Sequence, residues 1–120
     1  MRLEDLNWMD VDRYLDQDDR IILVTGATEQ HAYLSLLTDI LIPSRLALAA
    51  SERSGVVVAP PLNFGVSASF ADFPGTISLS QETFGQVLLE IVQSLAYQGF
   101  QSFFVLNGHG GNEPPAALLE

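Results

Sequence analysis

The residue best suited to chemistry in this chain is His109, which lies in the stretch Asn-Gly-His-Gly-Gly-Asn at 107–112. This stretch follows the apolar run 102–106, which is typical of a buried strand. Open α/β sheets bind their ligands beyond the carboxyl ends of their strands. We therefore expect His109 to lie at an active site.

The only other histidine, His31, has a similar context. It follows the apolar run 21–25, with Glu29 two residues before it and Asp39 eight residues after it. Side chains two residues apart in extended backbone point to the same side, so Glu29 and His31 are expected to be neighbouring ligands. Asp39 is expected at the end of a short loop, buried by the leucines that precede it.

Two imidazoles and two carboxylates form a donor set that suits Zn²⁺, Mn²⁺ or Fe²⁺. A carboxylate can bridge two ions, and two metals about 3.5–4 Å apart can share a hydroxide and polarise an amide carbonyl. Two other interpretations remain open. A histidine after a strand is often a hydrogen-bonded structural residue, and a glycine-rich turn before a helix can bind phosphate. The phosphate interpretation lacks both a Walker lysine and a Gly-x-Gly-x-x-Gly motif.

The composition excludes several classes of function. The 120 residues include no cysteine, which rules out disulfides and thiolate metal ligands. The formal net charge is −10, lysine is absent and every arginine precedes residue 54, so neither nucleic acid nor a membrane surface is an expected partner. No apolar stretch reaches the roughly 18 residues of a spanning helix, and the acidic start is unlike a signal peptide. We therefore expect a cytoplasmic protein.

Helices are predicted to alternate with the strands. Asn7 or Asp10 can cap a first helix that ends near Gln17, with the acidic residues of this region on its solvated face. Pro43 suits the first turn of a helix, so a second helix is expected to begin there and to end at Ser54-Gly55.

The alternation continues in the second part of the chain. The run 56–59 predicts a strand, and Ser80 can cap a helix that ends at Gly99. Asn112 is expected to cap a last helix that begins near 114–115.

Residues 62–75 form a long irregular segment rich in glycine, serine, phenylalanine and proline. A loop of this length inside a compact domain is often functional, so the segment is a candidate pocket wall. The alternative is an ordinary surface connection.

This alternation predicts an α/β fold with a mainly parallel sheet, in a single domain over residues 1–120. Parallel sheets are normally covered on both faces and rarely stop after three or four strands. The sequence is therefore expected to be truncated or to depend on a partner.

Four motifs, in the same order, resemble those of the creatininase family of creatinine amidohydrolase-like proteins. They are Thr-Glu-Gln-His at 28–31, Thr-Asp at 38–39, Phe-Pro-Gly-Thr-Ile-Ser-Leu at 73–79 and Asn-Gly-His-Gly-Gly-Asn at 107–112. The resemblance covers nearly the whole chain. It implies a three-layer α/β/α sandwich with a mainly parallel sheet, of which this chain would be the N-terminal half. It also implies a homo-oligomer, usually a hexamer.

The resemblance further implies a function. It indicates a divalent-metal-dependent amidohydrolase that acts on a small-molecule amide, opening a non-peptide C–N bond of a cyclic amide or formamide by metal-bound hydroxide. Glu29, His31, Asp39 and His109 would bind two ions of Zn, Mn or Fe, with Asp39 as the bridge and with Glu29 and His109 as catalytic residues. The alternative is a non-catalytic α/β module that binds a metal or a phosphate ligand.

Two departures from the family concern the substrate. Creatininase itself has a metal-binding glutamate where this chain has Gly111, and many members have a polar Glu-His pair where this chain has Ser69-Phe70. Creatinine is therefore not the expected substrate. If 62–75 lies over the site, the aromatic residues that flank the proposed metal ligands favour a substrate with an apolar or aromatic portion; they are Tyr33, Phe64, Phe70 and Phe73. The alternative is that these aromatic side chains pack into the core or a subunit contact.

Overall fold

The computed structural model describes residues 1–119. Its centre is a three-stranded parallel sheet in the order β2-β1-β3, formed by β1 (Arg20–Thr25), β2 (Val57–Val58) and β3 (Ser102–Asn107). The register pairs Thr25 with Asn107, so β1 and β3 end at the same level. The loops after these two strands therefore begin side by side.

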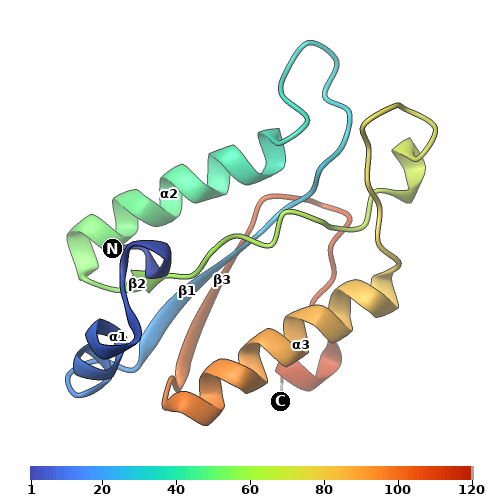
Figure 1. The fold of residues 1–120 in the computed structure, drawn as a ribbon. Helices are drawn as coiled ribbons and strands as arrows, with labels where there is room; N and C mark the ends of the chain where they lie inside the picture. The colour runs from blue at the N-terminus through green and yellow to red at the C-terminus, as the bar shows by residue number, and fades with distance from the viewer. Residues whose placement is uncertain (120) are drawn as a thin grey trace.

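Helices cover both faces of the sheet, as Figure 1 shows. The helix α2 (Thr38–Ser54) lies on one face, and α1 (Trp8–Leu15) and α3 (Gln81–Gln98) lie on the other. These three layers confirm the predicted α/β/α sandwich with a parallel sheet. Among residues 1–119, no helix combines the length and the apolar character needed to cross a membrane.

The core is divided by the central strand β1. Its side chains alternate between the two faces, so Ile22 and Val24 pack with Ala47 of α2, whereas Ile21 and Leu23 face the other layer. On that second face the fully buried residues include Phe84, Leu88 and Phe100. Residues 21–25 are all buried, which explains why this strand is a continuous apolar run in the sequence.

The caps of α1 and α3 are those predicted. The Asn7 side chain accepts hydrogen bonds from the N–H groups of Met9 and Asp10, each at 3.0 Å, and the Asp10 carboxylate accepts from the Asn7 N–H. Ser80 accepts from the Thr83 N–H at the start of α3. Gly99 ends that helix with a φ of 121°, a conformation that suits glycine.

The predicted start of the second helix is wrong. The helix α2 begins at Thr38, so Pro43 lies inside it, at a buried position, rather than in its first turn. Proline has no N–H to donate to the carbonyl of Asp39, four residues earlier. That carbonyl oxygen lies against the ends of β1 and β3 instead, where a Cβ atom on Gly26 or on Gly108 would overlap it.

The predicted cap role of Asn112 is also wrong. The last helical segment is a single 3-10 turn (Ala116–Leu118), and Asn112 lies buried some residues before it. Its side chain accepts from the Val66 N–H at 2.9 Å and donates to the Gly26 carbonyl at 2.9 Å and to the Asn107 side chain at 3.1 Å. An amide can donate and accept at once, so Asn112 joins the segments that follow all three strands.

The segment between β2 and α3 is irregular, as predicted, apart from a short 3-10 turn (Ala68–Phe70). It runs beside the loop after β1, since Thr28 and Ile77 form an isolated bridge and the Gln30 N–H donates to Thr76 Oγ1 at 3.1 Å. The two loops project at the end of the sheet where β1 and β3 terminate (Figure 1).

Candidate metal centre

Three of the four predicted site residues, Glu29, Asp39 and His109, form a cluster beyond the carboxyl ends of β1 and β3, and His31 contacts this cluster through Asp39. Glu29 and His31 follow β1, Asp39 is in the first turn of α2, and His109 follows β3. His109 Nδ1 lies 2.7 Å from Asp39 Oδ2 and 3.4 Å from Glu29 Oε1. His31 Nε2 lies 3.0 Å from Asp39 Oδ1. The two carboxylate oxygens of Asp39 thus face two different imidazoles.

Asp39 reaches this position in a different way from the one expected. It lies in a helix rather than in a loop, and Leu34 and Leu36 are exposed, so they do not cover it. The start of a helix carries partial positive charge from its free N–H groups, which favours a carboxylate there. This start is not marked in the sequence, because Leu37, the residue before the helix, makes no side-chain cap.

The ring of His109 is oriented by a backbone carbonyl. Its Nε2 lies 2.7 Å from the Val66 carbonyl oxygen, which can only accept, so this nitrogen carries the hydrogen. In the neutral ring, Nδ1 then has a free lone pair directed at Asp39 and Glu29. Histidines that bind metals commonly donate their other N–H in this manner.

His31 follows the same pattern. Its Nδ1 lies 3.3 Å from the carbonyl oxygen of Glu29, and when Nδ1 carries the hydrogen of the neutral ring, Nε2 has a free lone pair facing Asp39. In these tautomers both imidazoles donate to a backbone carbonyl and direct an accepting nitrogen at the same carboxylate.

This arrangement fits a divalent cation. Lone pairs of nitrogen and oxygen repel each other unless a proton or a cation lies between them. Protonating both rings would satisfy the nitrogens, but Glu29 Oε2 would still be buried without a hydrogen bond to any of residues 1–119. Glu29, Asp39 and His109 each offer a ligand atom within 4.8 Å of the others. A cation among them would satisfy all three.

The two oxygens of Asp39 differ in their neighbours. Oδ2 shares its surroundings with Glu29 and His109, whereas Oδ1 faces His31. Gly111 supplies no donor, and a Cβ atom there would overlap the Val66 carbonyl oxygen that orients His109. With the backbone as it stands, a side chain at position 111 would have to displace the carbonyl that holds the imidazole.

Several residues of the site were not predicted from the sequence. The most important is Val66, because its contribution is a backbone carbonyl and any residue type could supply it. Asn112 and Ser67 are buried beside it, and Ser67 Oγ lies 3.4 Å from His109 Nε2. The sequence feature that indicated a role for this segment was the length and irregularity of 62–75. The contact of its Val66 carbonyl with His109 fits the expected pocket wall.

Comparison with known proteins identifies related sequences along the chain. A family model described as creatinine amidohydrolase matches residues 4–119. The creatinine amidohydrolase of Pseudomonas putida is 30% identical over 115 residues, which cover 90% of this chain and 44% of that protein. The mycofactocin precursor peptide peptidase of Mycobacterium ulcerans is 37% identical over 102 residues, which cover 77% of this chain and 40% of that protein.

Solved structures have the same fold. A crystal structure of creatinine amidohydrolase (creatininase) matches with a TM-score of 0.87 and 28% identity, covering 93% of this chain and 46% of that one. Other solved creatininase structures are described as a Zn–Zn type and as a Mn form. The chain spans slightly less than half the length of these relatives.

Proposed function

The chain belongs to the creatininase family, and we propose that Glu29, His31, Asp39 and His109 hold two divalent metal ions in a hydrolase that opens a C–N bond. The observation that carries the proposal is the position of the Asp39 carboxylate. One of its oxygens lies 3.0 Å from the His31 imidazole and the other lies 2.7 Å from the His109 imidazole. This position supports the proposal that Asp39 would be the carboxylate shared by the two ions.

Divalent ions in such a site polarise an amide carbonyl and lower the pKa of water. Nitrogen and carboxylate donors suit Zn, Mn or Fe. His31 and His109 keep their accepting nitrogens directed at Asp39 because their N–H groups are held by backbone carbonyls. Glu29, whose carboxylate lies 3.4 Å from His109 Nδ1, would be a metal-linked carboxylate that takes the proton lost by the attacking water and passes it to the leaving nitrogen.

The substrate that we propose is a small cyclic amide or a formamide. Similarity to creatinine amidohydrolases supports a non-peptide C–N bond. Phe70 and Phe73, whose ring centroids lie 6.0 Å apart in an edge-on arrangement, lie in the segment that reaches His109. They favour a substrate with an apolar portion next to the amide.

A peptide bond is the second candidate. It is favoured by similarity to the mycofactocin precursor peptide peptidase of M. ulcerans, which is 37% identical over 77% of this chain, whereas the P. putida creatinine amidohydrolase is 30% identical over 90% of it. The two candidates share the metal centre and differ in the size of the amide that the site admits.

Turnover of a substrate panel tests the proposal. Purified protein supplied with Zn²⁺ or Mn²⁺ should hydrolyse lactams or formamides, and the Asp39→Ala variant should not. The exposed carboxylate of Asp72 lies outside the centre, so Asp72→Ala is the matched control and should retain activity. Cleavage of short peptides without lactam or formamide turnover would favour the second candidate. Metal binding without turnover of any substrate would indicate a non-catalytic metal-binding module.

A further inference from the structure

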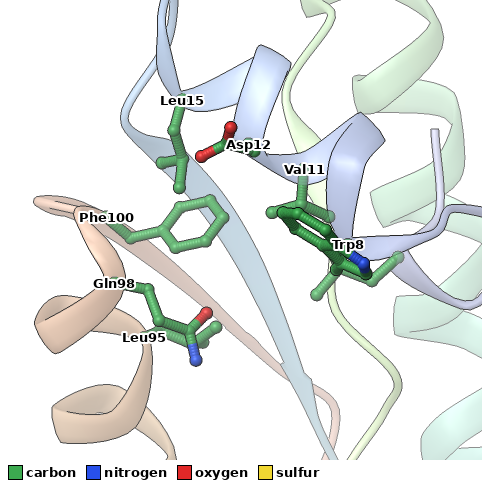
Figure 2. A pocket seen from close by; sticks show the side chains of 8 residues that line it. Trp8, Val11, Asp12, Leu15, Leu95, Gln98 and Phe100 are labelled. Atoms are coloured by element: carbon green, nitrogen blue, oxygen red, sulfur yellow. The ribbon is translucent and has the colours of Figure 1, made fainter.

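A groove between α1 and α3 lies at the opposite end of the sheet from the metal centre. Leu15 of α1 shortly precedes β1, and Phe100 shortly precedes β3, so the groove is at the amino ends of the strands. Its volume is about 380 Å³. Figure 2 shows the α1 side chains facing Leu95, Gln98 and Phe100 across this space.

Trp8 is the unusual residue of the groove. It lies in the first turn of α1 with 74% of its surface exposed, while Val11 and Leu15 of the same helix pack against the core. Tryptophan is enriched at binding surfaces because its large, rigid ring gains much contact area at low entropic cost. The exposed indole thus extends the apolar face of α1 beyond the part that the core covers.

A second cavity continues the groove along α3. Its volume is about 620 Å³, it shares Leu3 and Leu95 with the first cavity, and it extends to Val87 and Ile91. The two cavities form one elongated apolar surface. This shape fits a helical or extended polypeptide segment better than a compact small molecule.

Each cavity has a carboxylate on its wall, Asp12 in the first and Glu90 in the second. Neither forms an ion pair within residues 1–119, because the arginines of this side of the molecule pair with other acidic residues. No lysine or arginine occurs after residue 53, so α3 carries no positive charge. The groove therefore combines an apolar floor with two uncompensated negative charges.

We propose that this groove binds a protein segment that carries leucine-like side chains together with lysine or arginine. The apolar side chains would cover Trp8 and Leu95, and the cationic side chains would pair with Asp12 and Glu90. The net charge of −10 would draw such a segment toward the protein and would disfavour an acidic one.

Trp8 is the only tryptophan of the chain, so its fluorescence reports directly on the groove. The probe is a synthetic peptide of about a dozen lysine, leucine and alanine residues, and the control peptide has glutamate in place of lysine. The lysine peptide should shift the Trp8 emission to shorter wavelength in a saturable manner, and added salt should weaken the binding. The glutamate peptide should cause no shift. Equal shifts with both peptides, or no shift with either, would overturn the proposal.

Variants test whether the charges of the groove are responsible. Asp12→Asn combined with Glu90→Gln should weaken binding of the lysine peptide about fivefold, as expected for the loss of two exposed ion pairs. Glu52→Gln combined with Asp72→Asn removes the same net charge from exposed positions outside the groove, and should leave the affinity unchanged. Equal weakening in both double variants would show attraction to overall charge and would overturn the assignment of the groove. Circular dichroism would verify that both variants are folded.

Discussion

Asp39 shares its two carboxylate oxygens between imidazoles that come from different parts of the chain. The nitrogen that each ring directs at Asp39 is fixed by a carbonyl on its other side, from Glu29 for His31 and from Val66 for His109. A side chain that is already oriented loses less freedom when it binds an ion. The orientation of the rings is thus the main support, at this scale, for a metal centre.

Replacing the two carboxylates separately tests the bridging role of Asp39. Asp39→Ala should lose both ions, since each of its oxygens faces a different imidazole. Glu29→Ala should lose only the ion on the His109 side of Asp39, because the Glu29 carboxylate lies beside His109 and not beside His31. Elemental analysis after dialysis measures the metal content, with Asp72→Ala as the control. Loss of one ion from both variants would contradict a bridging carboxylate.

At the scale of elements, the start of α2 approaches the strand ends closely enough to exclude side chains. A Cβ atom on Gly108 would overlap the Asp39 carbonyl oxygen and crowd the Pro43 ring. Pro43 leaves that carbonyl without its usual helical partner, so the first turn of α2 is held by packing as well as by hydrogen bonds. The position of Asp39 therefore depends on glycine at the end of β3.

Gly108→Ala should displace α2 and with it Asp39. Crowding a packed site of this kind costs about 1–3 kcal/mol of unfolding free energy, and the metal content should fall at the same time. Gly110→Ala is the matched control, because no atom lies within 4 Å of a Cβ there. Thermal unfolding and elemental analysis measure the two effects. If the Gly108→Ala variant is as stable as the control and holds as much metal, the contact between α2 and the end of β3 is not tight enough to exclude a side chain.

The turn between α1 and β1 gives a prediction about acid stability. Hydrogen bonds from the Arg20 guanidinium and N–H to Asp18, at 2.7–3.0 Å, lower the pKa of Asp18 from 3.8 to about 2. A lowered pKa in the folded state stabilises the protein above the unfolded pKa, and this contribution disappears as the pH falls from about 4 to about 2.

Asp18→Asn should therefore lower the unfolding free energy at neutral pH by less than about 1 kcal/mol, because the ion pair is partly exposed. The difference from the parent protein should vanish near pH 2. Urea unfolding at several pH values measures it. If the difference in unfolding free energy is unchanged at pH 2, the effect of the substitution does not come from loss of the Asp18 charge.

The sequence predicts some elements well because their signals are local. Asn7 and Ser80 cap helices through their own side chains, and the apolar run of β1 marks a strand buried on both faces. The run 102–106 forms a strand, but the prediction that it is buried is wrong, since Phe104 and Val105 are exposed at the edge of the sheet.

Pro43 and Asn112 mislead because their local preferences are overridden by tertiary contacts. Proline is tolerated where α2 packs on the strand ends. The Asn112 amide bonds to two distant segments, at Gly26 and Val66, and to the nearby Asn107 instead of a helix start.

At the scale of the whole molecule, the parallel sheet brings the site together. Glu29 and His109 are far apart in sequence, yet they meet because β1 and β3 are adjacent, parallel and end at the same level. The alternation of strands and helices made this meeting predictable from the sequence. The backbone carbonyl of Val66 was not predictable, since it depends on the path of an irregular segment between two elements.

The metal content of the purified protein tests the central claim most directly. The protein is prepared without chelators, analysed for its elements, and then titrated with Zn²⁺ and Mn²⁺. We predict up to two equivalents per chain, with the first bound more tightly, since Glu29 and His109 both lie on one side of Asp39 and His31 lies on the other. Absence of a transition metal in the purified protein, together with no uptake during the titration, would contradict the assignment of these four residues as a metal centre.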